Sequence, residues 1–498
     1  MRKDVHSSEF RANRPRWICF FCHPHRNVRA PRLIMRKGSL ISEMNFGAQG
    51  PNLPIRRPSK SQEIKRKLGF WGLASTLAVI SFALEPQFLS YTVNAQSSAA
   101  REIPTFEVDT TWPHVPSQWV MGPVSGLTVD SHDHIWIITR PREIGTPSAS
   151  GGKPIEKGKT PAPPLMEFDV DGNFIKGWGG PGAGYDWPNA EHGVTVDDQG
   201  FVWVAGRGKD DDQILKFTND GKFVMQIGRA AQSKGNTDTT NLNLPADVTV
   251  YRKTNEVFVA DGYGNRRVIV FDADTGKFKR MWGAFGNVPT DPEKWDIPPG
   301  WKSIGRDRTY SSDDLEGQET LDGEQGPQQF SNVHSARISN DGLVYVCDRA
   351  NQRLQVFTIE GKYVGQVFIS RGHMALSNAT GSLFGKPRKE IVDQVLKNRE
   401  SPSRTAFSPD PEQRFLYVID RRHQRILILD RKSLQVLGSF GDGVGDAPGQ
   451  FYILHDMAAD SHGNIYTAEI DENSRVQKFV FKGMAIVPIS SSPPSQVQ

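Results

Sequence analysis

The chain has 498 residues with 47 glycines, 33 prolines and 23% charged side chains, which is enough for one large repeat domain with extensions. The net charge of +4 conceals two unlike parts, because residues 1–67 hold 16 basic and 4 acidic side chains whereas residues 96–498 hold 44 basic and 51 acidic ones. The predicted folded part is therefore acidic, and we expect no nucleic-acid partner.

The N-terminal part predicts export from the cytoplasm. We expect residues 1–67 to be a basic, disordered extension and residues 68–95 to be a signal peptide or membrane anchor. The apolar run Leu68–Leu84 follows the basic Lys65–Lys67, and a small-residue cleavage site ends at Ala95. The run is also near the lower length limit of a membrane-spanning helix. Both interpretations predict an extracytoplasmic protein, periplasmic or secreted, which contacts a membrane only through this segment if it stays uncleaved.

Residues 101–484 contain six similar units that predict an all-β domain. Each unit starts on an apolar strand at what we call its lead position, and these positions are Ser125, His192, Ala246, His334, Ser403 and His455. In most units a second strand and an Asn-x-Arg-apolar element follow. Then come a third strand, a turn and a fourth strand, which often ends at glycine, as at Gly228 and Gly365. Short alternating strands with a period of roughly forty to fifty residues are typical of β-propeller blades. We therefore predict a six-bladed β-propeller, preceded by the signal segment and followed by a tail, 485–498.

The short strand Phe106–Val108 precedes the first unit, and we expect it to pair with the last blade and close the ring, because an open ring would leave strand edges exposed. Three insertions interrupt the blades, at 141–164, 284–330 and 370–402. Loops of this length are often functional. They would wall a cleft if they extend over the face that carries the lead positions.

Three lead positions, His192, His334 and His455, are histidines in alternate units. The innermost strand of a propeller blade begins near the central axis, so alternate blades of six would place these side chains about 120° apart. Three histidines in that disposition predict a zinc site with one open position. A single histidine could equally be a satisfied core or loop residue. Coincidence explains three in one register poorly.

The units resemble the NHL-repeat class. The segments around Ser125, His192, Asp261–Asn265, His334 and His455 together resemble peptidyl-α-hydroxyglycine α-amidating lyase, a family of six-bladed propellers. The resemblance covers nearly all of residues 101–484. It implies a lyase that cleaves a carbinolamide to an amide and glyoxylate, with the three histidines as zinc ligands.

The resemblance also implies other site residues. It implies a structural calcium ion held by the main-chain carbonyls of Leu127 and Val194 and by the carboxylate of Asp456. Tyr263 matches the family's catalytic tyrosine. Arg140 matches its active-site arginine, although a shift of two residues would select Arg142 instead. The family's cysteine beside the tyrosine is Gly264 here, so the disulfide of the animal enzymes is absent.

Elementary chemistry is compatible with these roles. A carbinolamide collapses to an amide and an aldehyde when its hydroxyl loses a proton and its nitrogen leaves. Tyr263 near a guanidinium could be the base, because a nearby cation favours the phenolate. Arg140 could equally bind the substrate carboxylate. From the residues alone, Tyr263 could instead be a turn aromatic and Arg140 a strand-end salt bridge.

Two other classes of function stay open at this stage. One is a non-catalytic NHL propeller that binds peptide or protein, which would leave the alternating histidines unexplained. The other is a calcium-dependent propeller hydrolase, but such sites use carboxylate and amide oxygens, and no lead position carries Asp, Glu or Asn. For the lyase we expect a small-molecule or peptide substrate and a monomeric protein.

Overall fold

The structure is a computed structural model that describes residues 101–145, 154–291, 326–370, 401–470 and 474–487, all within one compact unit, Ser90–Gln498. It also describes four two-residue strands, which are β16 (Ser303–Ile304), β17 (Thr309–Tyr310), β22 (Ser382–Leu383) and β23 (Lys386–Pro387). The predicted basic extension and signal segment lie outside the described residues. In the part that is described, no helix has both the length and the apolar character needed to cross a membrane.

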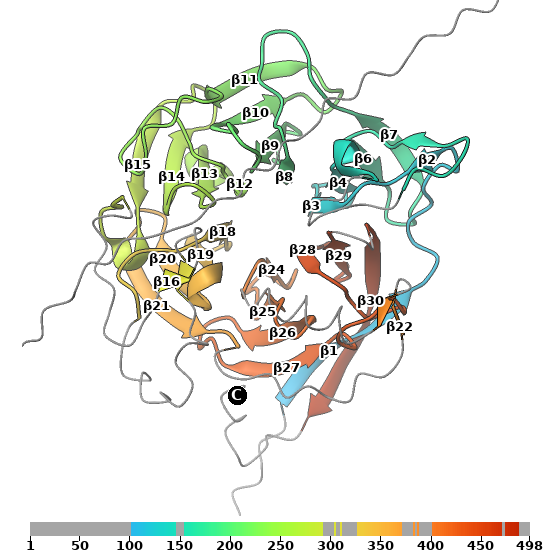
Figure 1. The fold of residues 1–498 in the computed structure, drawn as a ribbon. Coiled ribbons are helices and arrows are strands. Elements are labelled where there is room, and N and C mark those ends of the chain that lie inside the picture. The colour runs from blue at the N-terminus through green and yellow to red at the C-terminus, as the bar shows by residue number, and fades with distance from the viewer. Residues whose placement is uncertain are drawn as a thin grey trace, which may run out of the picture. The chain divides into compact units, whose positions relative to one another are not determined.

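Six four-stranded antiparallel sheets form the six predicted blades around a central axis (Figure 1). The strands of blades 1 to 3 are β3 (Val124–Val129), β4 (Ile135–Thr139), β6 (Leu165–Phe168) and β7 (Phe174–Trp178); β8 (Glu191–Val196), β9 (Val202–Gly206), β10 (Gln213–Phe217) and β11 (Phe223–Gly228); and β12 (Asp247–Tyr251), β13 (Glu256–Asp261), β14 (Arg267–Asp272) and β15 (Phe278–Trp282). Those of blades 4 and 5 are β18 (Val333–Ile338), β19 (Leu343–Asp348), β20 (Arg353–Thr358) and β21 (Tyr363–Phe368); and β24 (Thr405–Phe407), β25 (Phe415–Asp420), β26 (Arg425–Asp430) and β27 (Val436–Phe440).

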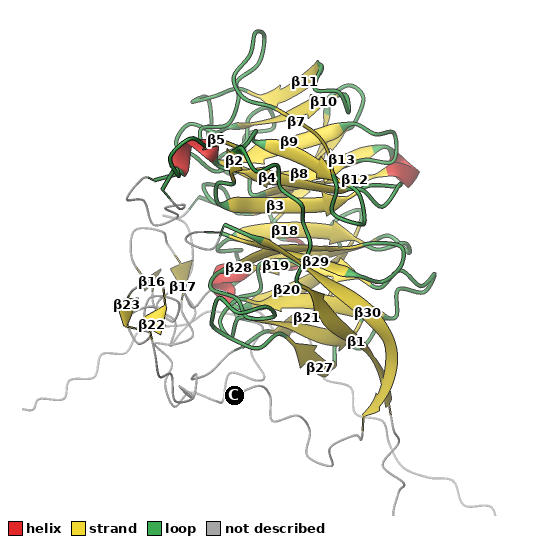
Figure 2. Ribbon diagram, turned by 90° about the vertical axis from the view of Figure 1, so that its right-hand side faces the viewer, coloured by secondary structure: helices red, strands yellow, loops and turns green. Residues whose placement is uncertain are grey.

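Blade 6 combines both ends of the domain, as the sequence predicts. Its strands are β28 (Leu454–Ala459), β29 (Ile465–Glu469), β30 (Val476–Val487) and the N-terminal β1 (Arg101–Asp109), which pairs antiparallel with β30. The two long strands run side by side in Figure 2. The expected strand 106–108 is therefore part of a longer one, and β30 continues past residue 484. Pairing of β1 with β30 satisfies a strand edge that would otherwise be exposed.

Apolar packing between neighbouring blades supplies the core. Six buried clusters each join two adjacent blades; Phe258 and Val268 of blade 3, for example, pack with Val344 and Phe357 of blade 4. The second strands of the blades are nearly continuous apolar runs because both of their faces are buried between neighbouring blades. Burial of one such side chain stabilises the fold by about 1.5–3 kcal/mol.

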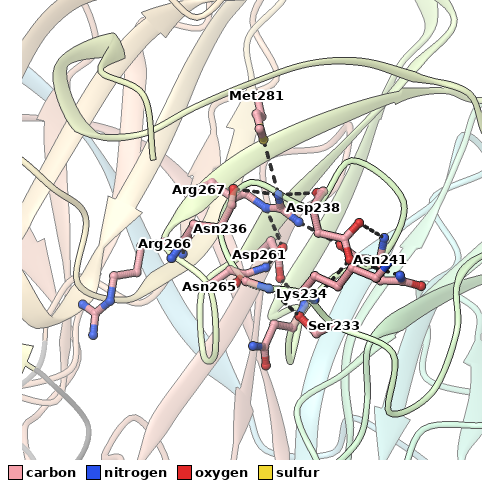
Figure 3. Close-up of polar contacts among 12 residues, drawn as sticks. Ser233, Lys234, Asn236, Asp238, Asn241, Asp261, Asn265, Arg266, Arg267 and Met281 are labelled. Atoms are coloured by element: carbon pink, nitrogen blue, oxygen red, sulfur yellow. Dashed lines mark hydrogen bonds and ion pairs between the residues drawn. The ribbon is translucent and has the colours of Figure 1, made fainter. Parts of the chain in front are cut away.

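The repeated Asn-x-Arg element proves to be a buried ion pair at the start of the third strand. In blade 3, Arg267 Nε lies 2.9 Å from Asp261 Oδ2, Asn265 Nδ2 donates to the same oxygen at 2.8 Å, and Arg267 donates to the carbonyls of Asn236 and Asn241, both at 2.9 Å (Figure 3). A buried charge is tolerated when it is paired and hydrogen-bonded in this way. In blades 3, 4 and 6 the arginine of this element therefore holds the second and third strands to the loop that enters the blade.

One predicted strand end is wrong. The sequence suggested that the fourth strand of blade 4 ends at Gly365, but β21 continues through Gly365 to Phe368. Gly365 has no atom within 4 Å of a Cβ built on it, so it marks neither a turn nor a close approach. In other blades, as at Gly228, a glycine ends the fourth strand, whereas Gly365 lies within it.

The three insertions leave the blades at one face. Strands alternate in direction, so the connections between second and third strands and between successive blades meet at the end where each first strand begins. The insertion within blade 1 and those before blades 4 and 5 are connections of this kind. They therefore start from the face that carries the lead positions, which the sequence could not decide. Most of their residues lie outside the described ranges.

Candidate metal centre

The three lead histidines converge on the axis. His192, His334 and His455 are each the second residue of their blade's first strand, and all three are buried. The pairing with the second strand shifts register at each of them. Such a bulge turns a side chain out of the sheet's regular alternation. The rings meet with centroids 4.8 to 5.0 Å apart and interplanar angles of 74° to 79°, close to threefold symmetry.

The next blade fixes the orientation of each ring. The Nδ1 atoms of His192, His334 and His455 lie 2.7, 2.8 and 2.8 Å from the carbonyls of Ala246, Ser403 and Ser125, which are the lead positions without histidine. A carbonyl only accepts, so each Nδ1 carries the proton and each Nε2 is unprotonated and can accept a hydrogen bond or bind a metal. The six lead positions thus alternate between a ring and the carbonyl that orients it.

These residues fit a metal ion. One ligand atom from each histidine lies within 4.8 Å of the others. Burial holds the pKa of all three imidazoles well below the ordinary value, so they are neutral at pH 7. His334 Nε2 is buried without a hydrogen-bond partner among the described residues. An unsatisfied buried nitrogen is costly, and a bound metal would satisfy it.

Tyr263 lies directly against this centre. It follows β13, and its Oη is 3.0 Å from His192 Nε2, so the hydroxyl donates to that nitrogen. Arg349 Nη1 donates to the same oxygen at 3.3 Å, and the guanidiniums of Arg349 and Arg207 each lie 5.4 Å from the ring centroid. The structure therefore places the predicted tyrosine beside a predicted zinc ligand.

Four arginines surround the tyrosine from equivalent places in four blades. Each directly follows the second strand of its blade, and they are Arg140, Arg207, Arg349 and Arg421. Burial alone would raise the pKa of Tyr263, but the four guanidiniums lower it below its ordinary value. The pattern was visible in the sequence, because Arg140, Arg207 and Arg349 each lie fifteen residues after a lead position. The histidine register alone does not point to Arg207, Arg349 or Arg421, which were not among the predicted site residues.

Arg140 and Arg142, the two candidates for the active-site arginine, lie in different surroundings. Arg140 is fully buried, its Nε donates to the Glu191 carbonyl at 2.6 Å, and its charge acts on Tyr263 and His192. Burial lowers the pKa of Arg140 to about 10, with a contribution from Arg207, and it stays protonated at pH 7. Arg142 is half-exposed and pairs with the Glu191 carboxylate at 3.0 Å.

The residues expected to hold calcium do not fit a calcium site. Both carboxylate oxygens of Asp456 accept hydrogen bonds from Arg404, and Oδ2 also accepts from the Leu127 N–H at 3.1 Å. Calcium needs six to eight oxygen ligands. Leu127 and Val194 are buried on the first strands of blades 1 and 2. The predicted carboxylate is therefore already engaged by a cation of the chain itself.

Two other features lie away from the histidines. A hollow of about 430 Å³ opens where the first strands end, with Val129, Phe407 and Ala459 in its wall. None of the three histidines lines this hollow, and they lie at the opposite end of the first strands.

A second group of possible metal ligands consists of Asp130, His134 and Glu167. These side chains already have partners within the chain: His134 Nδ1 lies 2.8 Å from Glu167, which also pairs with Lys176 at 3.2 Å.

Comparison with known proteins agrees with the fold. Residues 330–357, which span most of blade 4, match the NHL repeat. The chain is 28% identical over 293 residues to "Peptidyl-glycine alpha-amidating monooxygenase B" of Xenopus laevis, covering 56% of this chain but only 29% of that protein. It is 26% identical over 302 residues to "Probable peptidyl-alpha-hydroxyglycine alpha-amidating lyase" of Caenorhabditis elegans, covering 58% and 71%. It is 25% identical over 346 residues to "NHL repeat-containing protein 3" of Mus musculus, covering 62% and 81%.

The relatives thus include proteins named for an amidating activity and one named for its repeats alone. The match to the first of them spans less than a third of that protein's length. The chain is a six-bladed β-propeller with a match to the NHL repeat in blade 4, and it is similar to proteins named as amidating lyases and monooxygenases, as the resemblance in the sequence predicts.

Proposed function

We propose that the protein is a zinc-dependent carbon–nitrogen lyase that cleaves a carbinolamide, such as a peptidyl-α-hydroxyglycine, to an amide and glyoxylate. The observation that carries the proposal is the convergence of three neutral imidazoles, each oriented by the next blade, beside a tyrosine among arginines. His192, His334 and His455 would hold the zinc ion, which would supply a Lewis acid beside Tyr263.

Tyr263 is the base of the proposed reaction. Its phenolate takes the proton of the substrate hydroxyl, the oxygen lone pair forms the aldehyde C=O of glyoxylate, and the C–N bond breaks with its electrons going to nitrogen. The tyrosine then returns the proton to that nitrogen, so the products are a neutral amide and glyoxylate and no other reactant is consumed. The surrounding arginines favour the phenolate, because they lower the pKa of Tyr263.

The arginines also suit the charge of the substrate. An α-hydroxyglycine ends in a carboxylate, and glyoxylate keeps it. Arg140 and Arg349 come from blades 1 and 4 and both act on Tyr263, so a carboxylate between them would lie beside the base. A guanidinium binds a carboxylate through two parallel hydrogen bonds, which also fixes its orientation. We propose this positioning role for the two residues.

The test is glyoxylate release from α-hydroxyhippurate by the purified, zinc-loaded protein. We expect release well above the non-enzymatic rate, and loss of both zinc and release in His334→Ala. His462→Ala is the matched control, because this histidine is exposed, contacts Asp133 and lies outside the site. It should keep zinc and activity. No release from several carbinolamides, or full zinc retention in His334→Ala by elemental analysis, would contradict the proposal.

The alternative functions are outcomes of the same measurements. A non-catalytic NHL propeller predicts a protein without stoichiometric metal and without glyoxylate release. A calcium-dependent hydrolase predicts calcium at the axis and no zinc. Neither alternative explains why three imidazoles converge and the hydroxyl of Tyr263 lies 3.0 Å from one of them.

A further inference from the structure

Below the three histidines, the axis of the propeller contains a buried cluster of charged side chains. Arg404 precedes β24 and reaches across to two carboxylates, Asp456 of blade 6 and Asp247 of blade 3. Its Nε and Nη2 donate to the two oxygens of Asp456, and its Nη1 contacts Asp247 Oδ2. Arg404, Asp247 and Asp456 are all at least 97% buried.

A second arginine completes the cluster. Arg337 of β18 lies 3.3 Å from Asp247 Oδ1 through Nη2, and its Nη1 donates to the hydroxyls of Thr195 and Thr249 at 3.1 and 3.0 Å. Asp456 also accepts hydrogen bonds from the N–H groups of Leu127 and Met457, at 3.1 and 2.7 Å. Together with Arg404, these contacts draw on the first strand, or the residue before it, of all six blades.

The charges of this cluster balance without a metal. Two guanidiniums face two carboxylates, so the buried group is neutral overall. Burial alone would lower the pKa of Arg404, but the Asp247 and Asp456 carboxylates raise it, and it is charged at all ordinary pH values. Adding a divalent cation would leave two uncompensated positive charges in a buried site and set the ion against a guanidinium. Uncompensated buried charge costs several kcal/mol per ion.

We infer that the Arg404 guanidinium takes the place of a calcium ion at the axis, so that this propeller is joined at its centre by ion pairs and does not require calcium. The inference is independent of the proposed lyase activity. It assigns to Arg404 the cationic cross-link that Asp456 would otherwise obtain from a metal.

The cluster also forms the floor of the histidine site. Asp247, Arg404 and Asp456 directly follow the lead positions Ala246, Ser403 and His455. The carbonyls of Ala246 and Ser403 orient His192 and His334. Ion pairs among the following residues therefore hold in place the main-chain segments that set the ring positions.

The first test uses the wild-type protein. It is purified in calcium-free buffer with zinc, its metals are measured by elemental analysis, and its melting temperature is recorded without calcium and with millimolar calcium, the range that fills weak sites. We expect no stoichiometric calcium and an unchanged melting temperature. About one calcium per chain, or a melting temperature that rises with added calcium, would overturn the inference whether or not zinc or lyase activity is found.

The second test removes the internal cation. Arg404→Met leaves Asp247 and Asp456 facing each other beside the Leu127 N–H, so its melting temperature should fall and then recover by about 3 °C or more in millimolar calcium. Arg404→Lys keeps the charge and should stay indifferent to calcium. Arg431→Met is the matched control, because Arg431 is also buried and pairs at 2.9 Å with Asp341, away from the axis.

The control should lose stability that calcium does not restore. A folded Arg404→Met protein that gains nothing from calcium would show that the guanidinium does not occupy a latent calcium position. If Arg404→Met yields no folded protein, the calcium content and calcium response of the wild type and of Arg404→Lys decide the matter, since a calcium requirement in either contradicts the inference.

Discussion

The main-chain carbonyls of Ala246, Ser403 and Ser125 decide which nitrogen of each histidine faces the centre. The sequence could predict the three histidines, because histidine in one register of alternate repeats is an unusual pattern. It could not predict the acceptors, because every residue has a carbonyl and the relevant ones belong to the next blade. The same limit applies to Arg404, whose partners Asp247 and Asp456 are distant in sequence and have no local signature.

Tyr263→Phe tests the base assignment at a single oxygen atom. The substitution removes the hydroxyl that lies 3.0 Å from His192 Nε2 and keeps the ring that packs between Arg207 and Arg349. Turnover of α-hydroxyhippurate should fall by roughly 10²–10⁴-fold, the usual effect of losing a general base, while zinc content stays unchanged. Steady-state kinetics beside elemental analysis measure both. Full turnover in the variant would show that Tyr263 is not the base, and it would not bear on the proposed metal site.

Arg140→Met and Arg142→Met form a matched pair. Arg140 is buried and acts on Tyr263, whereas Arg142 is half-exposed and pairs with Glu191. Loss of one charge-assisted hydrogen bond of about 1.5–3 kcal/mol should lower kcat/KM by roughly 10- to 100-fold in Arg140→Met. Arg142→Met should stay near the wild-type value. Equal losses in the two variants would mean that the effect is structural and not specific to the site.

At the scale of elements, the blade starts and strand order follow from local alternation of apolar residues, which is why they were predictable. The wrong strand end at Gly365 arose because a glycine that ends one blade's strand was taken to end another. The long β1 was predicted too short, because Arg101–Thr105 lacks strict alternation and is held by its pairing with β30. Pairing between distant segments overrides weak local preference.

A bidentate ion pair within blade 3 makes a pH-dependent contribution to stability. Arg280 Nη1 and Nη2 each lie 2.7 Å from a Glu256 oxygen, and this guanidinium, with Thr254 and Lys279, lowers the pKa of Glu256 from 4.5 to about 2. A carboxyl with a depressed folded pKa stabilises the fold above its unfolded pKa, and the contribution is lost as pH falls from about 4.5 towards 2.

Glu256→Gln should therefore lower the free energy of unfolding at pH 7 by about 1–3 kcal/mol, allowing for solvent screening, and the difference from wild type should shrink at lower pH. Urea unfolding of both proteins between neutral and acidic pH measures it. Glu107→Gln is the control, since Glu107 pairs with Lys482 on the surface and should give no comparable pH-dependent difference. A Glu256→Gln deficit that persists unchanged at acidic pH would point to packing and not to charge.

For the whole molecule, ring closure depends on the most N-terminal strand described. β1 supplies the outer strand of blade 6, where Phe106 packs against Phe440 at a centroid distance of 4.4 Å. The buried ion pairs of Arg337 and Arg404 with Asp247 and Asp456 join blades at the centre. At the periphery, β1 pairs with β30 of the last blade and continues along the chain into the first blade. Loss of β1 would expose the edge of β30 and part of the cluster between blades 5 and 6.

This closure restricts where the chain can be processed. Cleavage after Ala95, as the signal segment predicts, leaves β1 complete from Arg101. We propose an extracytoplasmic mature protein that begins at Gln96, and we expect N-terminal sequencing of material from the periplasm or medium to find that residue. A mature protein whose first residue lies within 101–109 would lack part of β1, which pairs with β30. Such a protein should melt at a markedly lower temperature. Recovery of cytoplasmic protein with residues 68–95 intact would refute the export proposal and leave the fold and the metal centre unaffected.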